Sequence, residues 1–152
     1  MSKLKVYGIS ILIPLIAGAV IGLLTMSGSD FEVLSKPSLS PPGILFPIVW
    51  SILYTLMGIS YGMLVQKGKD SIEAKFIYFF QLGVNLLWSV FFFSLKWRLF
   101  SFIWILLLLL SVAAMIYVFY KRYKPSGLLQ IPYLGWVAFA SYLNLGIYIL
   151  NR

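Results

Sequence analysis

Residues 36–54, KPSLSPPGILFPIVWSILY, contain the transition on which the fold depends, because a proline-rich loop runs directly into an apolar segment. Pro37, Pro41 and Pro42 fix their own φ angles and lack a backbone donor, so they keep the loop stiff and non-helical. A proline in the first turn of a helix loses no hydrogen bond, so Pro42 is well placed in the first turn of the helix that follows. The stretch therefore predicts a rigid loop at the mouth of a membrane-spanning helix.

Three aromatic residues follow within this predicted helix. Phe46, Trp50 and Tyr54 recur at every fourth position, and residues four apart lie on the same face of a helix. Their rings would form an aromatic wall directly below the loop. We interpret this arrangement as the mouth of a binding site for a flat, apolar molecule.

The composition places the chain in a membrane. Hydrophobic residues make up 61% of it and charged residues only 11%, whereas about a quarter of the residues of a soluble domain are charged. The apolar runs have the ~20 residues that cross a hydrocarbon layer as a helix, and they lack the alternating polarity of barrel strands. We predict an all-α fold, one transmembrane domain (residues 1–152) with five helices, spans at about 6–26, 44–65, 76–93, 99–120 and 128–150, and a lid loop at 27–43.

The basic residues lie in short clusters between the apolar runs. A net charge of +8 arranged in this way suits anionic lipid headgroups and does not indicate a nucleic-acid partner. The positive-inside rule predicts a protein of the cell membrane with its N-terminus in the cytoplasm and its C-terminus outside. The more basic, cytoplasmic side would hold Lys3, Lys5, Lys67, Lys69, Lys75, Lys121, Arg122 and Lys124, and the outer side Lys36, Lys96, Arg98 and Arg152.

Polar and aromatic side chains also share helical faces on the third and last spans. Asn85 and Trp88 lie on one face of the third span, and Trp136, Ala140 and Asn144 on one face of the last. Amides in hydrocarbon need partners, so these faces point into the bundle. Counted at about 1.5 Å per residue, they meet the aromatic wall in the outer half of the membrane. Two interpretations of these side chains are open: they form hydrogen bonds between helices, or they line a ligand pocket.

Several absences limit the chemistry. The chain has no histidine and no cysteine, which removes the usual acid–base catalyst near neutral pH, any thiolate, and the His or Cys ligands of haem iron. No charged residue lies deep in a span, which argues against ion-coupled transport. We therefore predict no metal site and no cofactor.

Two pairs of glycines have the spacing that allows helices to approach closely. They are Gly18-x-x-x-Gly22 and Gly58-x-x-x-Gly62. Such pairs serve packing within one chain as well as contact between two copies. The second alternative, contact between two copies, would form a homodimer.

Three blocks carry a family resemblance that covers essentially the whole chain: KPSLSPPGILFPIVWSILYTLMG at 36–58, QLGVNLLWSVFFF at 81–93 and PYLGWVAFASYLN at 132–144. The sequence resembles the tryptophan-rich sensory proteins, the bacterial branch of the translocator protein or peripheral benzodiazepine receptor family (TspO/MBR). The resemblance implies a five-helix bundle, often dimeric. It also implies binding of porphyrins such as protoporphyrin IX, sterols and isoquinoline carboxamides.

The resemblance also assigns residues. Carried over by position, the pocket lining would include Trp50, Tyr54, Asn85, Trp88, Trp136 and Ala140, with Pro41 and Pro42 in the lid. Phe46 and Asn144 join this set through the helical faces described above. One departure concerns the first loop, where relatives often carry tryptophans and this chain has Phe31 and Leu39.

Three functions follow as hypotheses. The first is a membrane receptor or sensor for porphyrins and other flat apolar ligands. The second is light-dependent oxidative degradation of protoporphyrin, for which Trp50 and Trp136 match the implicated tryptophans, although nothing in the sequence establishes turnover. The third is passive transport of tetrapyrroles.

Overall fold

The structure, a computed structural model, describes residues 2–26 and 29–152, so positions 27 and 28 of the predicted lid loop lie outside the described residues. The elements are α1 (Lys3–Met26), the 3-10 helix η1 (Phe31–Val33), α2 (Leu45–Gln66), α3 (Ile72–Ser89), the π-helical segment η2 (Val90–Ser94), α4 (Arg98–Arg122), α5 (Lys124–Leu128) and α6 (Ile131–Asn151). Five helices are long and apolar enough to cross a membrane, counting η2 with α3 and α5 with α6. The predicted all-α class with five spans is confirmed.

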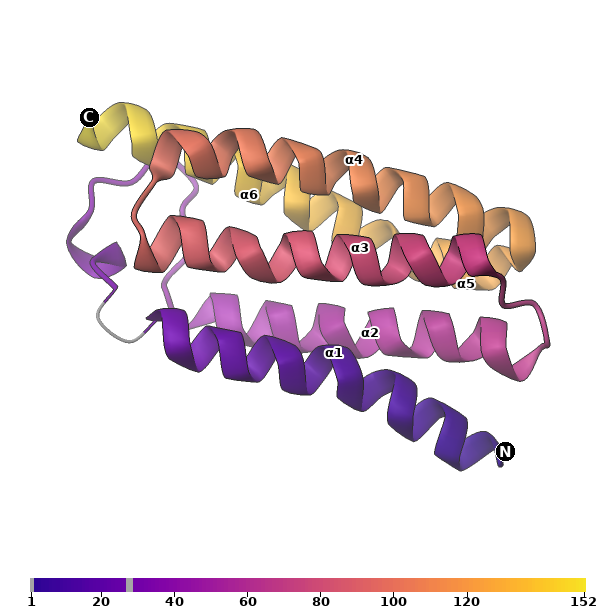
Figure 1. The fold of residues 1–152 in the computed structure, drawn as a ribbon. Coiled ribbons are helices and arrows are strands. Elements are labelled where there is room, and N and C mark those ends of the chain that lie inside the picture. Colours follow the sequence, from indigo (N-terminus) through magenta and orange to yellow (C-terminus); the bar gives the residue numbers. More distant parts are fainter. Residues whose placement is uncertain (1, 27–28) are drawn as a thin grey trace.

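The five long helices run along one common axis, with the described ends of the chain at opposite ends of the bundle (Figure 1). α1 packs mainly on α2, α3 packs on α4, and α4 packs on α6. Figure 1 also shows that α1 diverges from α2 toward its N-terminal end. Pro14 lies inside α1, where it removes one backbone hydrogen bond and bends a helix.

Pro42 lies outside α2, and α3 starts earlier than predicted. α2 begins at Leu45, because Pro42 and Gly43 still belong to turns and their carbonyls accept from the N–H groups of Leu45 and Phe46 at 3.0 and 3.3 Å. Pro42 therefore precedes the helix, and Pro47 takes the first-turn position at which a missing N–H loses nothing. α3 begins at Ile72 rather than near residue 76, since the hydroxyl of its N-cap, Ser71, accepts from Ala74 N at 3.1 Å.

A π-helical turn separates α3 from the loop that leads into α4. The N–H of Leu95 donates to the carbonyl of Val90 at 2.9 Å, which is the i to i+5 bond of a π-helix. Lys96 follows with a φ of +59°, in the left-handed region, and the chain then enters α4. This wide turn places two phenylalanines, Phe92 and Phe93, in the core.

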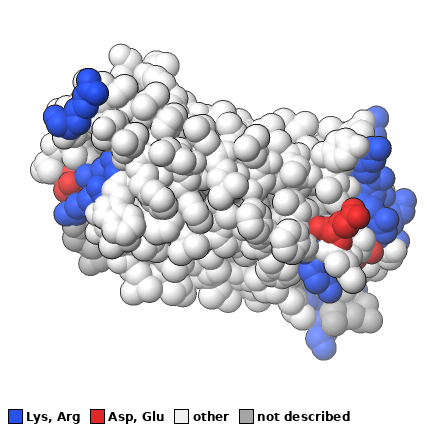
Figure 2. Space-filling model, turned by 45° about the horizontal axis from the view of Figure 1, so that its top comes forward, with Lys and Arg blue, Asp and Glu red and all other residues white. Residues whose placement is uncertain are grey.

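The charged side chains gather at the two ends of the molecule. Figure 2 shows Lys and Arg, with the few acidic residues, at either end of a broad uncharged belt. An apolar belt between two charged rims matches the layering of a lipid bilayer.

Candidate functional site

A cavity of about 670 Å³ lies between α1, α2 and the end of α3, in the half of the bundle that carries the first loop. Volumes of roughly 300–1,000 Å³ are usual for small-molecule sites. The lining is mostly apolar and aromatic, with no charged residue. It consists of Leu15, Gly18, Ala19, Ile21, Gly22, Leu23, Thr25, Met26, Phe46, Pro47, Trp50, Ser51, Tyr54, Trp88, Ser89 and Phe93.

Helix α2 provides the aromatic wall of the cavity. Phe46, Trp50 and Tyr54 lie on one face, as their spacing predicts, and all three line the cavity. The rings of Trp50 and Tyr54 are stacked, with centroids 5.5 Å apart and planes 27° apart. Trp88 and Phe93 complete the wall from α3 and η2, edge to face at 5.8 Å. Several ring faces and edges are thus available to a planar ligand.

Helix α1 provides the opposite wall, and its glycines let it approach α2 closely. A Cβ atom on Gly18 would overlap the ring of Tyr54, so only glycine allows α1 to lie directly on that ring. The same helix contacts Gly58 and Gly62 of α2, where added Cβ atoms would meet the backbone of Ile11 and the ring of Tyr7. Both glycines of that motif are therefore used for packing within the chain.

Behind the aromatic wall, a chain of hydrogen bonds joins α2, α3 and α6. The hydroxyl of Tyr54 donates to Asn85 Oδ1 at 2.6 Å, and Asn85 Nδ2 donates to the hydroxyl of Tyr133 at 2.7 Å. Tyr133 in turn donates to Gln81 Oε1 at 2.7 Å. Asn85 is only 2% exposed. Its amide therefore holds Tyr54 in place from behind and does not face the cavity.

A second hydrogen-bonded pair fixes Trp88. Its indole Nε1 donates to Asn144 Oδ1 at 2.9 Å, and Asn144 Nδ2 donates to the carbonyl of Arg98 at 2.9 Å. Asn144 thus links the cavity wall on α3 to α6 and to the first residue of α4. The rotation of the indole ring is set by this bond.

A phenylalanine of the first loop packs against two aromatic residues that line the cavity. Phe31 is 5% exposed and packs edge to face against Phe46 at 5.3 Å, while its ring centroid lies 6.1 Å from that of Phe93. Next to it, Asp30 accepts two hydrogen bonds from the guanidinium of Arg98, the shorter at 2.5 Å. That bond holds the pKa of the Asp30 carboxyl below its usual value of 3.8.

The rest of the loop is attached to α6. Asn151 and Ser35 exchange two hydrogen bonds, of 3.0 and 2.7 Å, between the amide side chain and the backbone. The hydroxyl of Tyr142 donates to the carbonyl of Ser38 at 2.7 Å. The loop is therefore held over the end of the bundle by contacts with α2, α4 and α6.

Comparison with known proteins places this architecture in a family. The TspO/MBR family model matches residues 10–150. The chain belongs to the TspO/MBR family. It is 40% identical to the tryptophan-rich protein TspO of Chlorobaculum tepidum over 80% of this chain and 78% of that one. It is 42% identical to the protein of the same name from Archaeoglobus fulgidus, over 78% and 77% of the two chains. A translocator protein from Ovis aries is 31% identical over 84% and 79%.

The predicted site residues of this TspO/MBR protein divide into two groups. Four of them line the cavity: Phe46, Trp50, Tyr54 and Trp88. The other six do not line it, and they are Pro41, Pro42, Asn85, Trp136, Ala140 and Asn144. Asn85 and Asn144 act through hydrogen bonds to lining residues, as described above. Pro42 is exposed and Pro41 half-buried in the loop.

Trp136 forms a second layer behind the aromatic wall. Its ring contacts Phe46 at 5.9 Å and Trp50 at 6.4 Å, both edge to face. Within the described part of the chain, its buried indole N–H has no hydrogen-bond partner. Ala140 is 5% exposed, one turn farther along α6. The two residues therefore support the wall and do not form its surface.

Sequence reasoning missed α1 as a wall of the site. The signal was present in the small residues Gly18 and Gly22, whose spacing indicates a packing or dimer motif but does not by itself indicate a cavity. Gly22 has no atom within 4 Å of the place where a Cβ would be, because it faces the cavity. The sequence also did not indicate that Phe31 packs on Phe46 and Phe93, because these contacts join distant segments.

Proposed function

We propose that this TspO/MBR family protein is a membrane receptor that binds porphyrins and other flat apolar ligands in the cavity between α1, α2 and α3. The observation that carries the proposal is the aromatic wall of Phe46, Trp50, Tyr54 and Trp88 facing a cavity of about 670 Å³ without a charged lining residue. Such a surface favours a planar, apolar molecule, because stacked or edge contacts with aromatic rings add about 0.5–1.5 kcal/mol each to burial.

The same geometry supports recognition by shape rather than by metal ligation. The chain has no histidine or cysteine to bind haem iron axially. Among the described residues, no group of three His, Cys, Asp or Glu side chains comes together as a metal site. A metal-free porphyrin, bound by stacking and by the fit of the cavity, is therefore the ligand with which to test the proposal.

The test is a titration of the full-length protein with protoporphyrin IX, followed by the shift of the porphyrin's own absorbance band. Trp50→Phe and Trp88→Phe each replace an indole that lines the cavity with a smaller phenyl ring. We expect the Kd to rise about three- to tenfold for each. Trp104→Phe is the matched control, because Trp104 does not line the cavity. Equal affinities in all four proteins would refute the proposal.

Light-dependent degradation of the bound porphyrin is the second candidate. The contact between Trp50 on the cavity wall and Trp136 behind it favours this activity, since an indole pair next to the pigment is an electron donor. The excited porphyrin and molecular oxygen would supply the oxidation. A new pigment that forms under light in the wild type, and more slowly in Trp50→Phe and Trp136→Phe at saturating porphyrin, would support it. Loss of porphyrin at the protein-free rate would exclude it.

Orientation in the membrane remains a proposal as well. The end of the bundle that holds the N-terminus carries more Lys and Arg than the other end, and Figure 2 shows both charged rims. We propose that this more basic end faces the cytoplasm. Single cysteines placed at Ser2 and at Ser38, with a membrane-impermeant thiol reagent, test it. Labelling of position 2 in intact cells would contradict it.

A further inference from the structure

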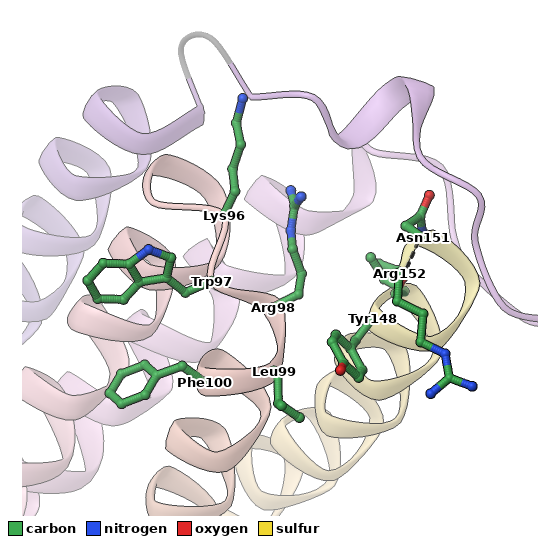
Figure 3. A pocket seen from close by; sticks show the side chains of 9 residues that line it. Lys96, Trp97, Arg98, Leu99, Phe100, Tyr148, Asn151 and Arg152 are labelled. Atoms are coloured by element: carbon green, nitrogen blue, oxygen red, sulfur yellow. Dashed lines mark hydrogen bonds between the residues drawn. The ribbon is translucent and has the colours of Figure 1, made fainter.

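A second pocket lies at the end of the bundle that carries the first loop, between the start of α4 and the end of α6 (Figure 3). Its volume is about 530 Å³, and none of its residues lines the aromatic cavity. We call it the α4–α6 groove. Its lining consists of Lys96, Trp97, Arg98, Leu99, Phe100, Ile147, Tyr148, Asn151 and Arg152.

The groove is positively charged. Three of its nine lining residues, Lys96, Arg98 and Arg152, are basic, and none is acidic. Arg98 is ion-paired with Asp30, which also lies near Lys96 and offsets part of the charge. In the part of the chain that the structure describes, Lys96 and Arg152 have no ion-pair partner. Two cations, one in the loop before α4 and one directly after α6, therefore border the groove.

The lower part of the groove is apolar and faces outward. Trp97, Leu99 and Phe100 are 52%, 46% and 44% exposed. Tyr148 on α6 is half-buried, and Figure 3 shows its ring opposite Leu99, whereas Trp97 and Phe100 point to the other side of α4. Exposed aromatic rings next to a basic rim mark the level at which headgroups meet the hydrocarbon layer. The groove thus joins a charged upper half to an apolar lower half at the membrane boundary.

The backbone at the groove is held in an uncommon conformation that carries a lysine. Lys96 has a φ of +59°, where glycine or asparagine is the less strained choice. Figure 3 shows its side chain extending alongside that of Arg98 toward the first loop. Strained residues of this kind concentrate at functional sites.

We propose that the α4–α6 groove binds an anionic phospholipid, with its phosphate attracted by Lys96 and Arg152 and its acyl chains lying over Leu99. Charge complementarity selects an anion, and the apolar half of the groove selects one that carries hydrocarbon chains. The positive end of the α4 helix dipole adds to the attraction. A free phosphate would use only the upper half, and a zwitterionic lipid would gain little from the net charge.

The experiment compares lipids retained by the full-length protein. The protein is placed in nanodiscs of phosphatidylcholine with increasing fractions of phosphatidylglycerol, extracted into mild detergent, and its bound lipids are counted by native mass spectrometry. Lys96→Asn removes the charge and keeps a residue that tolerates a positive φ, and Arg152→Gln removes the other. We expect about a fivefold loss of phosphatidylglycerol retention for each variant and about 25-fold for the pair.

Lys75→Gln is the matched control, because Lys75 is an exposed basic residue near the start of α3, at the end of the bundle away from the groove. Equal loss in this variant would overturn the proposal, since it would mean unspecific attraction to the basic rims. Displacement of the lipid by glycerol phosphate at equal concentration would also overturn it, because the chains would then contribute nothing. Unchanged melting in pure phosphatidylcholine checks that the variants fold, and porphyrin affinity, which depends on another cavity, is expected to stay unchanged.

Discussion

The hydroxyl group of Tyr54 offers a test of whether the buried network holds the aromatic wall or binds ligand. Tyr54→Phe removes one oxygen and keeps the ring that stacks on Trp50 at 5.5 Å. It deletes the 2.6 Å hydrogen bond to Asn85 Oδ1 and leaves that oxygen buried without its donor. Asn85→Leu removes two bonds, since the amide also donates to Tyr133.

The magnitudes follow from the number of bonds lost. Hydrogen bonds between helices in a membrane average about 0.6 kcal/mol and reach roughly 2 kcal/mol. We expect Tyr54→Phe to lower the free energy of unfolding by about 1 kcal/mol and Asn85→Leu by about 2 kcal/mol. Porphyrin affinity should fall less than about threefold in Tyr54→Phe, because the ring surface is retained.

The assay is a double-mutant cycle. Unfolding of the two single variants and of Tyr54→Phe/Asn85→Leu is followed by circular dichroism in mixed micelles, and affinity is measured by porphyrin titration. The double variant should be more stable than the sum of the single losses implies, by the energy of the shared bond. Additive losses in stability would refute the reasoning, as would a tenfold loss of affinity in Tyr54→Phe at unchanged stability.

Three further predictions concern packing, cavity volume and the loop. Gly58→Ala would push a methyl group into the backbone of α1 and should lower the free energy of unfolding by about 1–3 kcal/mol, measured by the same unfolding assay. Gly22→Leu should fill the cavity and abolish porphyrin binding in titrations, whereas Gly8→Leu, equally unobstructed on the same helix, should not. Asp30→Asn should raise hydrogen exchange in the first loop at pH 7, because the ion pair with Arg98 is lost.

The pH dependence of the loop follows from the same ion pair. The pKa of Asp30 lies below 3.8 in the folded protein, so its contribution to stability is present above that pH and is lost as the pH falls through the folded value. Hydrogen exchange of the loop amides, divided by their intrinsic rate at each pH, should therefore rise in the wild type below about pH 3.8 toward the value in Asp30→Asn. A rise in this ratio for the wild type already between pH 7 and 5 would contradict this assignment. Equal ratios in the two proteins at pH 7 would also contradict it.

The sequence predicted those features that depend on local composition and helical period. Apolar runs located the five spans, and the end of the third run at residue 93 lies one residue from the end of η2. The four-residue spacing of Phe46, Trp50 and Tyr54 placed three rings on one face, as the structure has them. Both inferences need only the chain's own periodicity.

The features that the sequence did not predict depend on contacts between distant segments. Whether Asn85 faces a cavity or a tyrosine is decided by Tyr54 and Tyr133, which lie on two other helices. The role of α1 depends on Gly18 meeting the ring of Tyr54. A face of a helix can be inferred from one sequence, but the neighbour that covers this face cannot.

The π turn of η2 determines which side chains can meet. In an uninterrupted α-helix, residues five positions apart lie about 140° from one another around the axis. The wider turn reduces this angle, so Trp88 and Phe93 both reach the cavity, with ring centroids 5.8 Å apart. Beyond the turn, the N–H of Trp97 binds the carbonyl of Phe91 at 2.9 Å. The five residues of η2 therefore set the rotation of the helix end, and removing one of them would misalign the aromatic wall and, on the other side, the α4–α6 groove.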